Sequence, residues 1–292
     1  MNIIILSSTH DAAGVNIQLK LIDIFEKTDL QFDNHVVYKK EYPNSTAYLI
    51  LTNQQITHAE CIDTRIREEL QIKADILLFA TKHASKSEIP SYCVHTQGNW
   101  NQADLGGNPQ EVASCPVVLK NALYRNLHQH NLQRFDVVNE ATHHGPTVKT
   151  PSVFIEIGSI AKQWNDDACG KAIANTIDQT LTTYDGEHSS TPVIFGIGGN
   201  HTCINYNELS KENVVLLGHV CPSFHVDAVT VDVLKQAFEK HTIEPIITID
   251  WKSLKSNQRV ILIEKLESAG LKYKRLKEVK TQFREDLSAN PE

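Results

Sequence analysis

The chain has 292 residues, 41% of them hydrophobic and 22% charged, which is typical of globular proteins. A chain of this length buries enough surface to fold without disulfides or a structural metal. Its 13 glycines and 10 prolines exclude collagen-like and low-complexity classes. The longest apolar runs cover about five residues, whereas a membrane-spanning helix needs about 20, so we expect no membrane span.

The first residues lack the basic start and the apolar length of a signal peptide. The six cysteines are widely spaced and form no C-x-x-C pair, which is typical of reduced thiols. We therefore expect a cytoplasmic protein.

The charge is unevenly distributed along the chain. Lys and Arg number 28 and Asp and Glu 35, a net charge of −7 that argues against nonspecific coating of nucleic acid. Between Lys252 and Arg284, however, ten basic and three acidic residues give +7, which leaves −14 for the rest. The basic segment 252–284 is predicted either to contact a polyanion or to form a solvated helix face.

The first 80 residues are predicted to alternate between strand and helix. Apolar runs indicate strands at 3–6, 48–51 and 75–80, and helical spacing indicates helices at 11–27 and 62–70. This order predicts a mainly parallel sheet with helices on its faces. Residues 82–115 are polar and rich in Gly and Asn, which indicates a long loop with a short strand at 92–94.

Further strands and helices are expected after this loop. A helix should begin at Pro116. The remaining predictions are strands at 136–138, 152–157, 191–195, 214–217 and 246–249, and helices over 164–181, 229–241 and 257–269. We therefore predict a single α/β domain, 1–292, with a mainly parallel or mixed central sheet and helices on both faces. It carries inserted loops at 82–115 and 142–151 and the basic C-terminal segment.

Four polar clusters follow predicted strands, where ligands of open α/β sheets bind. They are Lys82-His83, 95–104, 140–147 and 198–202. In the third cluster, Glu140, Thr142, His143 and His144 are candidates for catalysis, because histidine serves as general base, proton donor or zinc ligand near neutral pH. The alternative is a polar loop whose histidines bond to the backbone.

The fourth cluster contains a glycine turn ending at His201. Gly198 and Gly199 would let backbone N–H groups approach an anion or oxyanion. The turn lacks the G-x-G-x-x-G spacing and the Lys of a P-loop, so it is not a nucleotide fingerprint. The alternative is an ordinary tight turn.

The remaining candidates are substrate-binding residues and a buried carboxylate. His95, Asn99 and Trp100 suit a ribose or a stacked adenine, although Trp100 would equally cap a loop onto the core. Lys82 and His83 would bind phosphate or remain solvated. Glu156 lies inside an apolar strand, so it requires a metal, a histidine partner or a solvated edge. No G-x-S-x-G or H-E-x-x-H motif supports a serine hydrolase or zincin.

Taken together, these residues resemble the archaeal and plant type of D-aminoacyl-tRNA deacylase. The matching pieces are Lys82-His83, His95, Gly98-Asn99-Trp100, the string E-A-T-H-H-G-P-T at 140–147, Glu156, Trp164, Gly198-Gly199, His201 and Gly218-His219. They keep the family's order over about 270 residues. The glycine turn departs from the family pattern, because Asn200 replaces a Gly and Thr202 a Tyr.

This resemblance implies hydrolysis of the ester between a D-amino acid and the terminal ribose of tRNA. It also implies zinc dependence, a monomer, and a fold related to peptidyl-tRNA hydrolases and nucleoside phosphorylases. The partner would be tRNA carrying a D-amino acid, with no membrane involved.

The resemblance leads to a hypothesis for the roles of the candidates. The zinc ligands would be His143, His144 and His201, with Glu140 or Glu156 as a further ligand or base. The N–H groups of Gly198 and Gly199 would hold the oxyanion. Asn99 and Trp100 would receive the adenosine, and Lys82, His83 and His95 would contact the rest of the substrate.

Three alternatives to this hypothesis remain open. In a metal-free variant, one His acts as base and the substrate's free ribose hydroxyl assists. A nucleoside-phosphorylase-like enzyme would need a phosphate pocket, normally with Arg. A family member without activity would bind tRNA or zinc without turnover.

Overall fold

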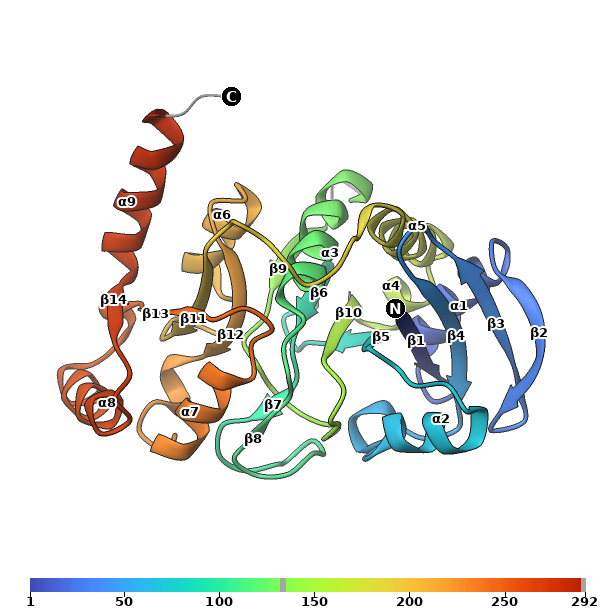
Figure 1. Ribbon diagram of the computed structural model, residues 1–292, viewed down its shortest axis with the longest axis horizontal. Helices are drawn as coiled ribbons and strands as arrows, with labels where there is room; N and C mark the ends of the chain where they lie inside the picture. Colours follow the sequence, from blue (N-terminus) through green and yellow to red (C-terminus); the bar gives the residue numbers. More distant parts are fainter. Residues whose placement is uncertain (132–134, 290–292) are drawn as a thin grey trace.

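A computed structural model describes residues 1–131 and 135–289, with side chains up to residue 283. Its main feature is a mixed eight-stranded sheet in the order β2-β3-β4-β1-β5-β10-β6-β9, which fills the right and centre of Figure 1. The strands are β1 (Asn2–Ser8), β2 (Glu26–Phe32), β3 (His35–Glu41), β4 (Thr46–Thr52), β5 (Ile76–Ala84), β6 (Ser91–His95), β9 (Asp136–Asn139) and β10 (Ser152–Ser159). The predicted mixed α/β fold is confirmed.

Alternating side chains of the central strands bury both faces of this sheet. On β1, Ile3 and Ile5 face one apolar core, and Ile4 and Leu6 face the other. The first core lies beneath α1 (Ala12–Ile22), α3 (Val117–His130) and α5 (Asp167–Thr183), and α2 (Ile62–Leu70) covers the second. The short helix α4 (Ala161–Trp164) precedes α5. Helices therefore cover both faces of the sheet, as the sequence predicted.

The strands of the C-terminal third form a second, fully parallel sheet in the order β12-β11-β13-β14. These strands are β11 (Val193–Ile197), β12 (Leu216–Cys221), β13 (Ile246–Ile249) and β14 (Tyr273–Arg275). Helices α7 (Val231–Glu239) and α8 (Ser256–Ser268) pack on one face, and α6 (Ile204–Lys211) and α9 (Leu276–Ala289) on the other. The second sheet lies beside the β9 end of the large sheet (Figure 1). A single domain stays a prediction.

Two of the sequence predictions for local structure were wrong. The helix expected over 11–27 ends at Ile22, and the chain continues into the hairpin β2–β3. The expected loop 82–115 contains the end of β5, all of β6 and the short pair β7 (Gly98–Asn99) and β8 (Glu111–Val112). The short strand expected at 92–94 is therefore β6, a buried strand of the large sheet. Residues 142–151 form no helix or strand and lie between β9 and β10.

Two further findings concern membranes and thiols. Within the described ranges, no helix is both long and apolar enough to cross a membrane. All six cysteines are free, and only Cys61 is exposed.

Candidate active site

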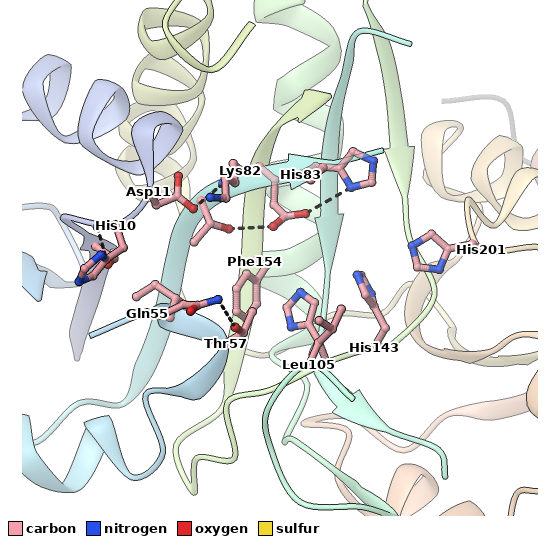
Figure 2. A pocket seen from close by; sticks show the side chains of 16 residues that line it. His10, Asp11, Gln55, Thr57, Lys82, His83, Leu105, His143, Phe154 and His201 are labelled. Carbon is pink, nitrogen blue, oxygen red and sulfur yellow. Dashed lines mark hydrogen bonds and ion pairs between the residues drawn. The ribbon is translucent and has the colours of Figure 1, made fainter. Parts of the chain in front are cut away.

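A cleft of about 770 Å³ opens where β1, β4 and β5 end. The polar residues at the ends of these strands are Ser8, His10 and Asp11 at the end of β1, Gln55 and Thr57 after β4, and Lys82 and His83 at the end of β5. Figure 2 shows His10 and Asp11 on one side of the cleft and His143 and His201 on the other, with Phe154 between them. The carboxyl ends of parallel strands thus form one wall, as expected for an α/β sheet.

The register of β10 places Glu156 in the floor of the cleft. Glu156 pairs with Thr81 of β5 on one side and with Cys93 of β6 on the other. Its Oε1 accepts a hydrogen bond of 2.8 Å from the Thr81 hydroxyl, and the residue is 3% exposed. The partner that a buried carboxylate in an apolar strand requires is therefore supplied by the neighbouring strand.

His95 ends β6 and is brought to the same site by antiparallel pairing. It lies opposite Phe154 of β10 and stacks on that ring at 5.0 Å. Its Nε2 is 3.5 Å from the Glu156 carboxylate, and this buried nitrogen has no hydrogen-bond partner. The Nδ1 faces the Thr96 carbonyl at 3.4 Å. Because a carbonyl only accepts, this contact favours the tautomer with the proton on Nδ1, in which the lone pair of Nε2 faces the site.

The turn that follows β9 carries His143 and His144 into the cleft. Ala141 and Thr142 donate their N–H groups to His201 and Val220 of the second sheet region, at 2.7 and 3.0 Å. The Nδ1 of His143 donates to the Ala141 carbonyl at 2.8 Å, and that of His144 to the Gly145 carbonyl at 2.6 Å. Both Nε2 atoms therefore keep a free lone pair.

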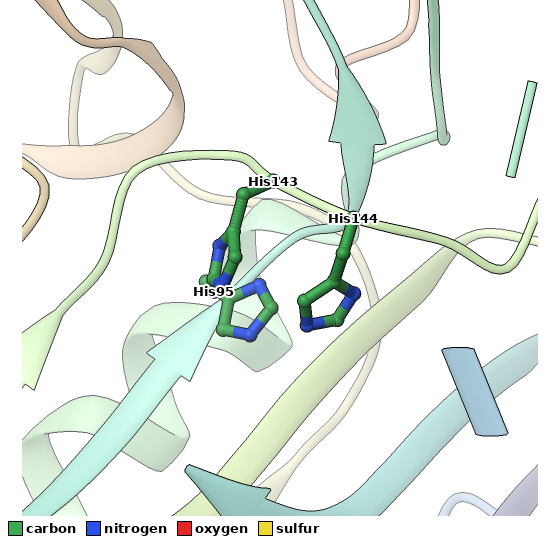
Figure 3. Close-up of side chains that lie close together, drawn as sticks. All are labelled: His95, His143 and His144. Atoms are coloured by element: carbon green, nitrogen blue, oxygen red, sulfur yellow. The ribbon is translucent and has the colours of Figure 1, made fainter. Parts of the chain in front are cut away.

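These imidazoles form one cluster, which we call the histidine cluster (His95, His143, His144 and His201). Figure 3 shows the first three converging, with ring centroids 4.2 Å apart for His95 and His143 and 4.3 Å for His143 and His144. The His201 ring is 4.5 Å from that of His143. Rings that lie far apart in the chain therefore share one cavity.

Burial and mutual repulsion keep His143 and His144 neutral. Burial and the neighbouring imidazoles lower the pKa of His143 well below its usual range, and burial lowers the pKa of His144 to about 4. Neutral imidazole is the form that accepts a proton or binds a metal. At pH 7 both side chains are ready for either role.

Glu140 lies behind the cluster and connects it to the end of β5. It is 2% exposed, and its two oxygens are 3.4 Å from His201 Nε2 and 3.3 Å from His83 Nδ1. Burial alone would raise the pKa of Glu140, but these two imidazoles hold it well below its usual range. Burial lowers the pKa of His83, and Glu140 outweighs this effect and raises it. Glu140 is thus a buried carboxylate whose charge is stabilised by the imidazoles on its two sides.

The donor set fits a divalent metal of zinc type. The ligand atoms of His95, His143 and His144 lie within 4.8 Å of one another, as do those of Glu140, His143 and His201. His95 Nε2 and both oxygens of Glu140 are buried without a hydrogen bond. Since a lone pair facing a carboxylate is unfavourable, a cation between His95 and Glu156 would satisfy both groups.

Two predicted site residues lie in the core instead of the cleft. Trp100 is 1% exposed, stacks on Phe195, and donates its indole N–H to the Thr142 carbonyl at 2.9 Å. The Thr142 hydroxyl bonds to His219 Nδ1 at 2.9 Å. An adenine cannot stack on a ring that is already covered, so the structure corrects the adenosine role of Trp100. Its burial agrees with the alternative given for Trp100, in which the ring caps a loop onto the core.

The glycine turn and Asn99 are also occupied by internal bonds. Gly198 donates its N–H to the Cys221 carbonyl at 2.8 Å, and Gly199 to the Ser253 hydroxyl at 2.7 Å. Neither N–H is free for an oxyanion, which corrects that expectation. Asn99 donates to the Gly106 and Asn108 carbonyls and fixes the loop between β7 and β8. Asn200 Nδ2 donates to Thr202 Oγ1, so the two departures from the family pattern contact each other.

Sequence reasoning missed part of the cleft. His10, Asp11, Gln55 and Thr57 line it directly after β1 and β4. Lys82 was selected because it follows a predicted strand, and His10 and Asp11 follow the predicted strand at 3–6 in the same way. The same argument would therefore have identified them. Leu105 also lines the cleft and is 60% exposed, which no local pattern indicates.

The fold and the site define an α/β protein with a histidine–carboxylate cleft. Similar proteins identify the family to which the chain belongs. The family model described as D-aminoacyl-tRNA deacylase matches residues 70–274, and the chain belongs to this family.

Two relatives named D-aminoacyl-tRNA deacylase illustrate the match. The protein of Pyrococcus abyssi is 34% identical, covering 92% of this chain and 98% of its own. That of Methanosarcina mazei is 32% identical, covering 96% and 94%. The crystal structure of AF0625, a conserved protein of unknown function, superimposes with a TM-score of 0.81 at 25% identity over 96% of both chains. The family resemblance is thereby confirmed.

Proposed function

We propose that this chain hydrolyses the ester bond of D-aminoacyl-tRNA and releases the D-amino acid and free tRNA. One observation carries the proposal: neutral imidazoles and buried carboxylates converge on a single open cleft in a chain whose relatives are named D-aminoacyl-tRNA deacylase. Ester hydrolysis needs an activated water, and a neutral imidazole supplies the base.

In the metal-free form of the proposed reaction, His143 Nε2 accepts a proton from water as the water oxygen bonds to the ester carbonyl carbon. The carbon–oxygen bond to the ribose then breaks, and the ribose oxygen takes this proton back from the imidazolium. Glu140 is buried against His201 and His83, and these two imidazoles stabilise its negative charge. Its negative charge stabilises the imidazolium that forms at His143.

A zinc ion would fit the same residues, and we propose that the chain binds one. His95, His143 and His144 would hold it, and because His143 Nε2 would then be a ligand, Glu156, which lies beside His95 and lines the cleft, would act as the general base. His201, expected as a ligand beside His143 and His144, instead groups with Glu140 and His143. When bound, zinc lowers the pKa of a bound water to about 7. Glu156 would balance the charge, and the carbonyl-bonded Nδ1 atoms fix the orientation of both rings.

The competing functions find less support at the cleft. A nucleoside phosphorylase needs a cationic phosphate pocket, and no arginine lines this cleft among the described residues. A family member without activity would retain the fold and the ligands but not turn over substrate. Only a kinetic measurement separates this alternative from the proposed enzyme.

The direct test is side-by-side hydrolysis of D-tyrosyl-tRNA and L-tyrosyl-tRNA by the purified protein. We expect rapid release of D-tyrosine and much slower release of L-tyrosine. Binding of either tRNA without release of any D-amino acid would overturn the proposal and favour the inactive family member.

The zinc proposal has a separate test, which is extensive treatment with a chelator followed by titration with zinc. We expect D-tyrosyl-tRNA hydrolysis to be lost and then restored by about one equivalent of zinc per chain. Full activity after complete metal removal would eliminate the metal and leave the metal-free variant, in which His143 acts as base.

A further inference from the structure

The positive charge of this chain is concentrated at the outer end of the second sheet. The segment 252–284, with a net charge of +7 in a chain of −7, forms α8, β14 and the first part of α9. In Figure 1 these orange and red elements lie on the side of β11 and β12 that faces away from the large sheet. A polyanion approaching this protein is attracted to that end and repelled by the rest.

The carboxyl ends of the second sheet connect the basic end to the cleft. Ile197 of β11 is in register with Ile249 of β13, which in turn is in register with Arg275 of β14. The residues after Ile197 lead to His201 at the cleft. With neighbouring strands about 4.8 Å apart, Arg275 starts about 10 Å from the strand that leads to His201.

Trp251 holds two guanidinium groups at this edge. The Arg275 guanidinium lies 4.1 Å and that of Arg259 5.1 Å from the Trp251 ring centroid. Arg259 also donates from Nε to the Trp251 carbonyl at 3.0 Å. Among the side chains that the structure describes, no carboxylate forms an ion pair with either arginine. Lys252 and Lys255 are both exposed and lie with Trp251 in the segment between β13 and α8.

We propose that this arginine edge (Lys252, Lys255, Arg259 and Arg275) binds backbone phosphates of the tRNA acceptor end, whose 3′ terminus enters the cleft. Guanidinium groups recognise phosphate through paired N–H donors, and stacking on Trp251 orients them before the RNA arrives. The inference rests on the proposed function, because it takes tRNA as the substrate. It assigns the edge a role in binding and none in bond cleavage.

The test measures binding of uncharged tRNA to the full chain as a function of KCl concentration. We expect Arg275→Ala to weaken binding roughly tenfold and to lower the salt slope by about one, and Arg259→Ala with Arg275→Ala to lower it by about two. Arg67→Ala is the matched control, because this α2 side chain is 58% exposed and lies outside the edge. It should leave both quantities unchanged.

Kinetics distinguish a failure of this inference from a failure of the proposed function. With D-tyrosyl-tRNA, the double variant should raise KM and leave kcat within about twofold, since the edge touches no reacting atom. Binding and salt slope equal to those of wild type would overturn the inference even if hydrolysis proceeds. Salt-dependent binding that needs the arginines, without any hydrolysis by wild type, would overturn the proposed function alone.

A second variant guards against unfolding, because Trp251 packs partly against the core of the second sheet. Lys252→Ala with Lys255→Ala removes two exposed charges from the same edge and leaves the Trp251 contacts in place. It should also reduce tRNA affinity and the salt slope, and an unchanged slope would count against the edge.

Discussion

The histidine turn after β9 and the glycine turn after β11 make an instructive comparison. Both follow a strand, both carry residues with positive φ, and both were predicted to act in catalysis. The histidine turn directs His143 and His144 into the cleft with their Nε2 lone pairs free. In the glycine turn, the N–H groups of Gly198 and Gly199 donate to the Cys221 carbonyl and the Ser253 hydroxyl, and it is the neighbouring His201 that lines the cleft.

The difference shows which kind of donor a strand-end turn can offer to a substrate. A backbone N–H near a sheet is readily bonded within the fold, because unpaired buried groups are costly. An imidazole has two nitrogens, so one can anchor the ring to a carbonyl while the other remains available. We therefore expect the chemistry to depend on the side chains of the histidine turn, with the glycine turn acting as a support.

The largest expected effect comes from removing the imidazole at the centre of the cluster. His143 contacts His95, His144 and His201, so His143→Ala should lower kcat/KM on D-tyrosyl-tRNA by about a hundred- to ten-thousandfold. Thermal unfolding should change little, since the ring lines an open cleft.

His188→Ala is a suitable control for this variant, because the His188 side chain is 68% exposed and pairs with the exposed Asp185. It should retain full activity. A His143→Ala protein that folds normally and keeps wild-type turnover would remove the histidine turn from the mechanism.

A smaller expected effect concerns the buried carboxylate between the two turns. Glu140→Gln leaves His83 and His201 without their charged partner, and removing one member of a buried pair costs about 3 kcal/mol. The pKa of Glu140 is lowered in the folded protein, so its contribution to stability is complete above about 4.5 and is lost as the pH falls through the folded pKa. Urea unfolding in the presence of a chelator measures this.

We expect the free energy of unfolding of the wild type to fall more steeply than that of Glu140→Gln between about pH 5 and about pH 3. Glu88→Gln, in an exposed turn, should follow the wild type. Parallel curves for wild type and Glu140→Gln would show that the carboxylate is not held in its charged form.

Local sequence patterns were sufficient for the central strands and the histidine turn. The apolar run at 3–6 and the four-residue spacing of Ile62, Ile66 and Leu70 correspond to β1 and α2. The hairpin β2–β3 was missed because most of β2 is solvent-exposed and polar, so it lacks the alternation that identifies a half-buried strand.

Long-range packing decided the residues that local patterns could not place. His95 reaches the cluster because β6 runs antiparallel to β10, and Trp100 leaves it because Phe195 of the second sheet covers its ring. Both outcomes depend on strand pairing and on contacts between distant segments. Neither leaves a signal within the four residues that separate His95 from Trp100.

The smallest expected effect tests the supporting role of the glycine turn. Ser253 Oγ accepts the Gly199 N–H at 2.7 Å and donates to the Asp250 carbonyl, so Ser253→Ala releases that N–H. If the bond only supports the turn, the variant should lose about 1 kcal/mol of stability and keep kcat within about twofold. Ser268→Ala, which removes an exposed hydroxyl bonded within α8, is the matched control. A change in kcat of about tenfold or more in Ser253→Ala alone would indicate that the Gly199 N–H takes part in catalysis, because a single oxyanion donor is worth at least that much.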